Sequence, residues 1–156
     1  MIRTRKRLTL CIILLVAILA FIWGNSAMPG ETSGALSGWL GDILSTLFPI
    51  LATENGLHIL RKIAHFSEFA ALGIILSWLF GMTAERPHWR YALPLLCGAA
   101  AACIDEIIQI FSPGRYCSPV DVGIDCAGVL TGCLILQLLY LVICRTGFNN
   151  SKKSSG

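Results

Sequence analysis

Residues 122–144 decide the fold: they read VGIDCAGVLTGCLILQLLYLVIC, with Asp125 as the single charged residue. As a helix this stretch is long enough to cross a hydrocarbon core of about 30 Å. Three further apolar blocks, at residues 8–24, 63–82 and 91–111, are of spanning length and contain no Lys or Arg. We therefore predict an all-α fold, a polytopic membrane protein built as a four-transmembrane-helix bundle.

The composition of the whole chain also favours a membrane protein. Of its 156 residues, 55% are hydrophobic and 13% are charged, and the mean hydropathy is +0.72. An ordinary soluble domain carries about 25% charged residues. The composition excludes a disordered chain and argues against a soluble enzyme, and the chain has no basic stripe interleaved with aromatic residues, the pattern typical of nucleic-acid binding. We predict a single membrane domain over residues 1–148 and a flexible tail at 149–156.

Basic residues predict the orientation, since Lys and Arg near span ends collect on the cytoplasmic side. With both termini cytoplasmic, nine basic residues lie inside and three lie outside. The nine are Arg3, Arg5, Lys6, Arg7, Arg86, Arg90, Arg145, Lys152 and Lys153, and the three are Arg61, Lys62 and Arg115. A cleaved signal peptide ending at Ala27 is the alternative for the first block, but Asn25 is a poor residue three positions before a cleavage site.

Residues 35–51, between the first two spans, have apolar side chains at i, i+3, i+4 and i+7, which is one stripe of a helix. The stripe consists of Leu36, Trp39, Leu40, Ile43, Leu44, Leu47, Phe48 and Leu51. We expect an amphipathic interfacial helix on the outer membrane surface. Packing against the bundle is the alternative.

Ionisable residues inside a membrane are costly and indicate a functional site. All of those in this chain fall at the predicted outer ends of their spans. They are His65 and Glu68 in the second span, Asp105 and Glu106 in the third and Asp125 in the fourth, and polar Gln109 and Asp121, the latter just before the fourth span, lie at the same ends. Facing lipid would cost about 2.5–3.5 kcal/mol per charged residue, so these side chains should face the bundle interior. The sequence predicts that three helices bring them to one patch beneath the outer headgroups.

The charges of this patch do not balance. Five carboxylates face two fixed cations, Lys62 and Arg115, and one titratable residue, His65. Either some carboxyl groups stay protonated, or a divalent cation or a cationic ligand completes the site. No other cofactor is expected. Arg115 ends the turn Ser112-Pro113-Gly114-Arg115, where it could clamp a phosphate or a carboxylate.

This chemistry predicts a role for each candidate residue. His65, Glu68, Asp105 and Glu106 are candidates for acid–base catalysis or metal ligation, and the ligand-binding candidates are Lys62, Gln109, Arg115, Asp121 and Asp125. The alternative is that the network only holds the helices together, at about 0.6–2 kcal/mol per hydrogen bond.

Small and nucleophilic side chains give weaker indications of helix packing and reactivity. Gly128 and Gly132 form a small-x-x-x-small face, for which packing within one chain is favoured and an oligomer is the alternative. Cys117, two residues from Arg115, could have a lowered thiol pKa, although an ordinary loop cysteine is the simpler interpretation.

Three motifs occur in order along residues 61–132. The first is KIAHFSEFAALG at 62–73, the second is DEIIQ at 105–109 followed by Phe111 and Pro113-Gly114-Arg115, and the third is Asp121 followed by Asp125 and Gly128. Together they resemble the VanZ-like family of small membrane proteins, which usually has Tyr in place of Phe69 and often Asn in place of Asp125. The resemblance implies a four-span bundle in the bacterial cytoplasmic membrane. For the family's namesake it implies a contribution to resistance against teicoplanin, which acts outside that membrane on lipid-linked cell-wall precursor.

The leading functional hypothesis is an outward-facing polar site that binds the headgroup of a membrane lipid or of a cell-wall precursor and contributes to glycopeptide resistance. The alternative is a non-catalytic membrane scaffold that alters drug access to the cell envelope, for which Trp39, Ile43 and Leu47 would matter more than the carboxylates. A proton-coupled transporter is less favoured, because four spans without repeats are few for alternating access.

Overall fold

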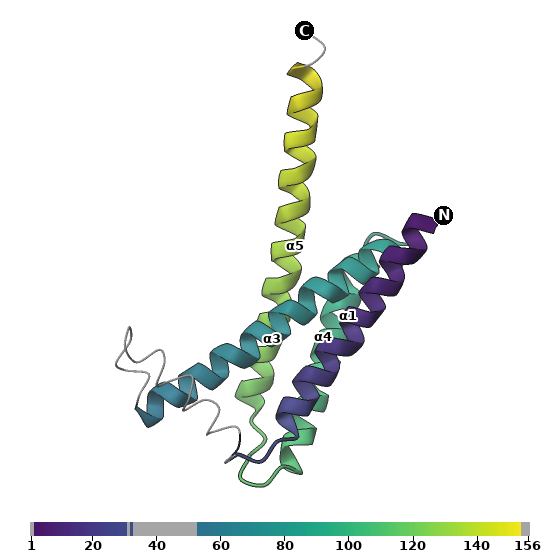
Figure 1. Ribbon diagram of the computed structural model, residues 1–156. Coiled ribbons are helices and arrows are strands. Elements are labelled where there is room, and N and C mark those ends of the chain that lie inside the picture. Colours follow the sequence, from purple (N-terminus) through teal and green to yellow (C-terminus); the bar gives the residue numbers. More distant parts are fainter. Residues whose placement is uncertain (1, 31, 33–52, 154–156) are drawn as a thin grey trace.

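A computed structural model describes residues 2–30, 32 and 53–153 of the chain, and Figure 1 shows its arrangement. The described residues form four long helices: α1 (Ile2–Ser26), α3 (Glu54–Thr83), α4 (Trp89–Ile110) and α5 (Pro119–Lys153). All four are long and apolar enough to cross a membrane. The prediction of an all-α, four-span membrane protein is therefore confirmed. The interfacial helix predicted at 35–51 lies outside the described residues.

The helices alternate in direction, so that two ends of the bundle are distinguished. In Figure 1 the start of α1, the α3–α4 connection and the end of α5 lie toward one end, and the loop between α4 and α5 lies at the other. α1 packs against α3 and α4, and α3 crosses α5. The polar candidates come from the end that holds the α4–α5 loop, because that is where α1 and α4 finish and α5 begins.

Two helix boundaries differ from those predicted. α3 begins at Glu54, well before residue 63, because Thr53 caps it: the Thr53 side chain accepts a hydrogen bond of 3.1 Å from the backbone N–H of Gly56. α5 continues to Lys153, into the stretch where a tail was expected from residue 149. Helical hydrogen bonds are local and no proline follows Pro119 in α5 to interrupt them.

The crossing of α3 and α5 depends on glycine. A Cβ on Gly132 would overlap the carbonyl oxygen of Ala70, and one on Gly73 would overlap the carbonyl oxygen of Val129. A Cβ on Gly128 would also overlap the carbonyl oxygen of Phe66 in α3. The small face of α5 is therefore used for packing within the chain, which is the interpretation that the sequence favoured.

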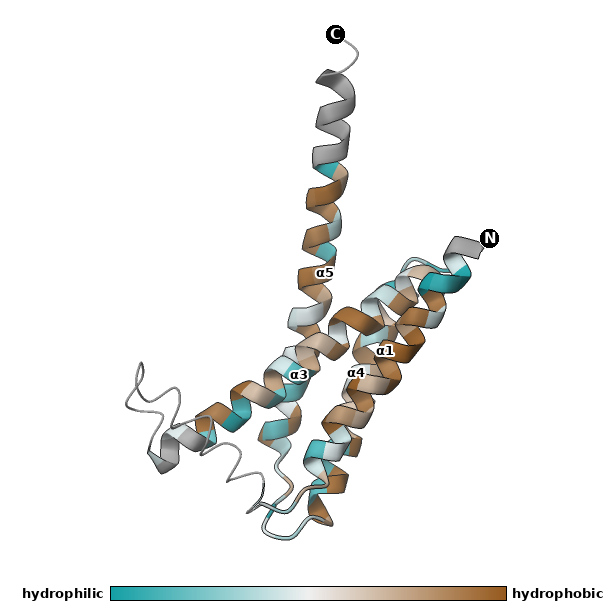
Figure 2. Ribbon diagram, viewed as in Figure 1, coloured by the Kyte–Doolittle hydropathy of each residue, from teal (hydrophilic) through white to brown (hydrophobic). Residues whose placement is uncertain are grey.

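The buried core is small and most apolar side chains face outward. The core consists of Ile22, Phe69, Leu72, Leu76, Ala101, Ala102, Val129 and Cys133. By contrast, Val16 is 62% exposed and Ile143 is 67% exposed. Figure 2 shows hydrophobic residues along most of each helix and hydrophilic residues near the end with the α4–α5 loop. Lipid contact accounts for this outward apolar surface.

Candidate functional site

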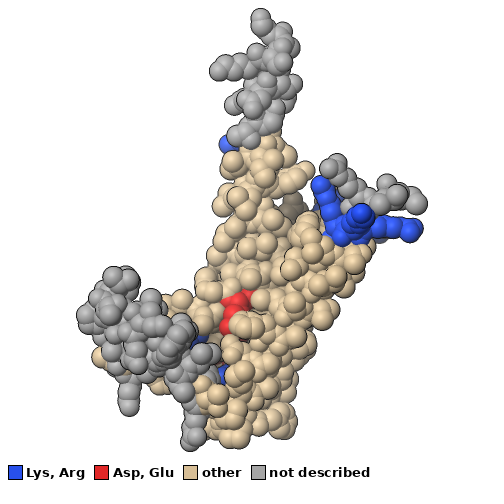
Figure 3. All heavy atoms as spheres, in the orientation of Figure 1, with Lys and Arg blue, Asp and Glu red and all other residues tan. Residues whose placement is uncertain are grey.

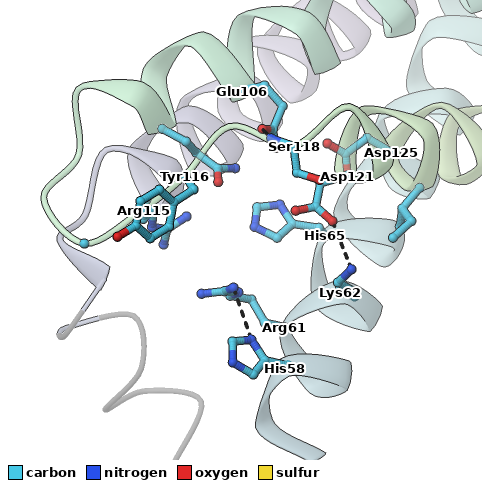
Figure 4. A pocket seen from close by; sticks show the side chains of 13 residues that line it. His58, Arg61, Lys62, His65, Glu106, Arg115, Tyr116, Ser118, Asp121 and Asp125 are labelled. Atoms are coloured by element: carbon cyan, nitrogen blue, oxygen red, sulfur yellow. Dashed lines mark hydrogen bonds and ion pairs between the residues drawn. The ribbon is translucent and has the colours of Figure 1, made fainter. Parts of the chain in front are cut away.

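A cavity of about 370 Å³ opens between the first half of α3, the end of α4, the α4–α5 loop and the start of α5. Figure 4 shows the side chains around it. They belong to His58, Arg61, Lys62, His65, Glu106, Gln109, Gly114, Arg115, Tyr116, Ser118, Asp121, Ile124 and Asp125. The cavity thus combines side chains from three helices with those of the loop that joins two of them.

Three cations, Arg61, Lys62 and Arg115, form what we call the basic rim of the cavity. Lys62 Nζ lies 3.2 Å from Asp121 Oδ1, and these side chains are 45% and 33% exposed. Within the described part of the chain, no carboxylate oxygen lies within 4.0 Å of either guanidinium. Arg115 Nη2 instead donates to the backbone oxygen of Asn25 at 3.1 Å, and Arg61 Nη2 lies 3.4 Å from His58 Nδ1.

The positive charge of Arg61 also acts on the Arg115 guanidinium. Partial burial, followed by the positive charge of Arg61, lowers the pKa of the Arg115 guanidinium from its ordinary value. Arginine is nevertheless charged at every physiological pH. The cavity therefore holds two guanidinium cations without carboxylate partners in the described residues, which is an arrangement suited to an anion.

Three acids, Glu68, Asp105 and Asp125, form what we call the buried acidic cluster. Asp105 is fully buried and Asp125 is 2% exposed, while the Glu68 side chain is 12% exposed. His65 lies among them, because its Nδ1 is 4.0 Å from both Glu68 Oε2 and Asp105 Oδ2. One acid comes from each of α3, α4 and α5, so the structure brings side chains of three helices together in one cluster.

The end of α1 supplies the donors that hold this cluster, together with Gln109 of α4. Asn25 Nδ2 donates to Glu68 Oε1 at 3.0 Å, and Ser26 Oγ donates to Asp105 Oδ2 at 2.8 Å. Gln109 Nε2 donates to the same Asp105 oxygen at 3.0 Å. Asn25 and Ser26 were not predicted as site residues, although two polar residues directly after an apolar span are a visible signal.

Glu106 and the serines of the α4–α5 loop fix the path of that loop. Glu106 Oε2 accepts a hydrogen bond of 2.7 Å from the backbone N–H of Ser118, one residue before α5 begins. Ser112 Oγ donates to the backbone oxygen of Ser26 at 2.8 Å, and Gly114 adopts a φ of 74° that suits glycine. The loop is thereby tied to α1 and α4, which positions Arg115 at the cavity.

Cys117 does not have the microenvironment of an activated thiol. Desolvation, and then the hydrogen bond and negative charge of Glu106, raise the pKa of the Cys117 thiol above its usual value. The raised pKa agrees with the ordinary loop cysteine that the sequence favoured and not with a thiol activated by Arg115.

The predicted site residues divide into two groups. Those that line the cavity are Lys62, His65, Glu106, Gln109, Arg115, Asp121 and Asp125. Glu68 and Asp105 do not line it and lie behind it, held by Asn25 and Ser26. Arg61, which the sequence analysis placed only on the outer side, lines the cavity together with His58 and Tyr116. The site is thus more basic at its rim than the sequence indicated.

Comparisons with known proteins give one match. The sequence model described as VanZ/LLP1 matches residues 11–140, a range that reaches into all four helices. No curated protein matches the chain, and no solved structure matches it.

Proposed function

Since this chain belongs to the VanZ/LLP1 family, we propose that its cavity binds the phosphate-bearing headgroup of a membrane lipid or of a lipid-linked cell-wall precursor. We further propose that this binding contributes to glycopeptide resistance. One observation carries the proposal: Arg61 and Arg115 face the same cavity, and neither has a carboxylate partner among the described residues.

The chemistry of the rim favours phosphate over a neutral ligand. A guanidinium group presents parallel N–H donors that match two oxygens of one phosphate, and Lys62 adds a third positive charge. The cavity of about 370 Å³ has room for a phosphate or pyrophosphate with its immediate substituents. His65, Glu68, Asp105 and Glu106 stay candidates for acid–base or metal chemistry, which headgroup binding does not require.

The proposal includes an orientation in which the cavity faces outward and both termini are cytoplasmic, in a bacterial cytoplasmic membrane. It is supported by the group of basic residues near the start of α1, which Figure 3 shows at a distance from the visible carboxylates, whereas fewer basic atoms lie beside those carboxylates. Cys117, an exposed thiol of the α4–α5 loop, provides the test. In a variant with Cys117 as the sole cysteine, a membrane-impermeant maleimide should label intact cells. Labelling only after lysis would contradict the orientation.

Binding is tested with the purified chain in nanodiscs of phosphatidylcholine. Phosphatidylglycerol and a polyprenyl diphosphate are added separately, and the lipid that the protein retains is measured by native mass spectrometry. We expect preferential retention of at least one of the two, and the comparison of the two arms identifies the source of the phosphate. The Arg61→Ala/Arg115→Ala variant should lose the preference by about tenfold, equivalent to about 1.4 kcal/mol.

Arg86 is the matched control for that experiment, because it is an exposed arginine in the α3–α4 connection at the other end of the bundle. Arg86→Ala should retain the wild-type preference. Equal retention of all three lipids by the wild-type chain, or equal losses in Arg86→Ala and in the double variant, would refute the binding proposal.

The contribution to resistance is tested in a teicoplanin-susceptible bacterium that expresses the chain. Expression should raise the minimal inhibitory concentration, and Arg115→Ala or Glu106→Ala should abolish the increase at unchanged protein level. Arg115 contacts the proposed headgroup, whereas Glu106 holds the loop that carries Arg115. Unchanged resistance in both variants would defeat the link between the cavity and the phenotype.

A membrane scaffold that alters drug access is the second candidate function. It is favoured by the hydrogen bonds from Asn25 and Ser26, which tie the acids of α3 and α4 to the end of α1. A scaffold predicts that resistance survives Arg61→Ala/Arg115→Ala but is lost when Trp39, Ile43 and Leu47 are replaced by Ala. The opposite pattern supports the binding site.

A further inference from the structure

The carboxylates of the buried acidic cluster are only half satisfied. Asp105 Oδ2 accepts hydrogen bonds from Ser26 and Gln109, while its Oδ1 has no hydrogen-bond partner among the described residues. Glu68 is held in the same way, with Oε1 bound to Asn25 and Oε2 unpartnered there. Asp125, which is 2% exposed, also has an unpartnered Oδ1. Neutral donors thus orient two of the carboxylates and leave one oxygen of each available.

Ligand atoms of His65, Asp105 and Asp125 lie close together, and the Asp105 oxygen 4.0 Å from His65 Nδ1 is Oδ2, which also accepts from Ser26 and Gln109. One ligand atom each from His65, Asp105 and Asp125 lie within 4.8 Å of one another. His65 Nδ1 is buried and likewise makes no hydrogen bond to a described residue. Three atoms bound tetrahedrally to one ion at about 2.0–2.2 Å are about 3.3–3.6 Å apart. A movement of up to about 1 Å per ligand atom therefore converts this arrangement into a coordination site.

The charge of the cluster favours a cation at this point. Among the described residues, the only Lys or Arg within 4.0 Å of a carboxylate is Lys62, and its partner Asp121 is outside the cluster. Buried carboxylates without a positive partner are costly in a membrane, and a divalent ion would neutralise two of them. Hydrogen bonds from neighbouring residues commonly orient metal ligands. Asn25 makes such a bond to Glu68, and Ser26 and Gln109 make such bonds to Asp105.

We propose that His65, Asp105 and Asp125 bind one divalent transition-metal ion such as Mn²⁺ or Zn²⁺. One imidazole nitrogen with two carboxylates suits these ions, whereas Ca²⁺ takes six to eight oxygen ligands. Glu68 Oε2, 4.0 Å from His65 Nδ1, is placed to become a fourth ligand. The site lies at the wall of the cavity, because His65 and Asp125 also line it. The inference goes beyond headgroup binding and does not depend on it.

The experiment uses the full chain in detergent, cleared of metal with a chelator and then equilibrated with Mn²⁺. After gel filtration, elemental mass spectrometry should find about one Mn²⁺ per chain, and Zn²⁺ should displace it. Pulsed electron paramagnetic resonance should show ¹⁴N coupling from the imidazole. His65→Gln should remove this coupling, and Asp105→Asn or Asp125→Asn should weaken Mn²⁺ binding at least tenfold.

Glu85→Gln is the control, since Glu85 is an exposed carboxylate in the α3–α4 connection and does not line the cavity. It should bind Mn²⁺ like the wild-type chain, and an equal loss in this variant would overturn the assignment. If the cluster variants do not fold, the wild-type chain decides, because no retained Mn²⁺, or Mn²⁺ without ¹⁴N coupling, refutes the site. The lipid preference of Arg61→Ala/Arg115→Ala is measured without metal, so the two proposals fail independently.

Discussion

The basic rim and the buried acidic cluster belong to the same site, but their hydrogen-bond partners are of different kinds. At the rim, the guanidinium groups of Arg61 and Arg115 contact a histidine and a backbone carbonyl. In the cluster, Glu68 and Asp105 receive hydrogen bonds from neutral donors. Opposite charges that could neutralise each other across the cavity are kept apart. The difference leaves both guanidinium groups without Asp or Glu ion-pair partners, and the cluster carboxylates without Lys or Arg partners, among the described residues, as the two binding proposals require.

The largest expected effect comes from disturbing the frame that both regions share. Gly132→Ala should lower stability by about 1–3 kcal/mol or more, because its Cβ would overlap the backbone of α3 at Ala70. α3 carries Arg61, Lys62 and Glu68, and α5 carries Asp125 and begins directly after the loop that holds Arg115, so lipid preference and Mn²⁺ binding should fall together. Thermal unfolding in detergent, followed by gel filtration, measures the stability.

Gly123→Ala is the control for that substitution, because a Cβ there meets nothing within 4 Å. It should leave stability unchanged or raise it by up to about 1 kcal/mol, as expected for Gly→Ala within a helix. If Gly132→Ala lowered stability but spared either the rim or the cluster, the two regions would not share one frame.

A smaller effect is expected from a substitution that changes the cluster and leaves the rim unchanged. Ser26→Ala removes one donor from the buried Asp105 carboxylate and should cost about 1–3 kcal/mol of stability. The lipid preference of the rim should not change. Ser67→Ala is the control, because the Ser67 hydroxyl is exposed and donates only to the backbone of its own helix. A loss of lipid preference in Ser26→Ala would show that the rim depends on the cluster.

The next prediction tests whether the rim recognises phosphate through paired donors or through charge alone. Arg115→Lys keeps the positive charge but loses the planar pair of donors, so phosphate-lipid retention should fall several-fold, to a value between those of the wild type and Arg115→Ala. Native mass spectrometry in nanodiscs measures it. Identical retention in Arg115→Lys and the wild type would mean that the rim attracts lipid by charge alone.

The smallest effect is expected for the ion pair that Lys62 of the rim makes with Asp121. Lys62→Ala breaks the 3.2 Å pair with Asp121, but both side chains are substantially exposed. The loss should stay below about 1 kcal/mol and shrink further at high salt. Melting curves at low and high ionic strength check this, and a large, salt-independent loss would contradict the surface character of the pair.

The sequence predicted much of the fold because membrane spans are set by local composition. Four apolar blocks gave four helices, and the glycines of α5 indicated close packing. The partner of those glycines could not be predicted, since only tertiary structure brings Gly132 against Ala70 of α3. The early start of α3 at Glu54 could have been found from Thr53, a favourable capping residue directly before it.

The site was predictable where helical spacing applies. Asp105 and Gln109, four residues apart on α4, lie on one face of the helix and are joined by a hydrogen bond of 3.0 Å. Spacing says nothing about contacts between helices, so the roles of Asn25 and Ser26 at the end of α1 were missed. Arg61 was missed as a rim residue for the same reason, because its place at the cavity depends on how α3 packs beside the α4–α5 loop.

Solid-state nuclear magnetic resonance can test the central claim directly by measuring the separation between the ¹⁵N-labelled Arg115 guanidinium and the ³¹P nuclei of phosphatidylglycerol or polyprenyl diphosphate in a bilayer. The Arg115 signal is assigned by its disappearance in Arg115→Lys. We predict a ¹⁵N–³¹P separation within roughly 4–5 Å, as a direct guanidinium–phosphate pair requires. Phosphorus contact confined to other arginines, with none at Arg115 for either lipid, would contradict the account.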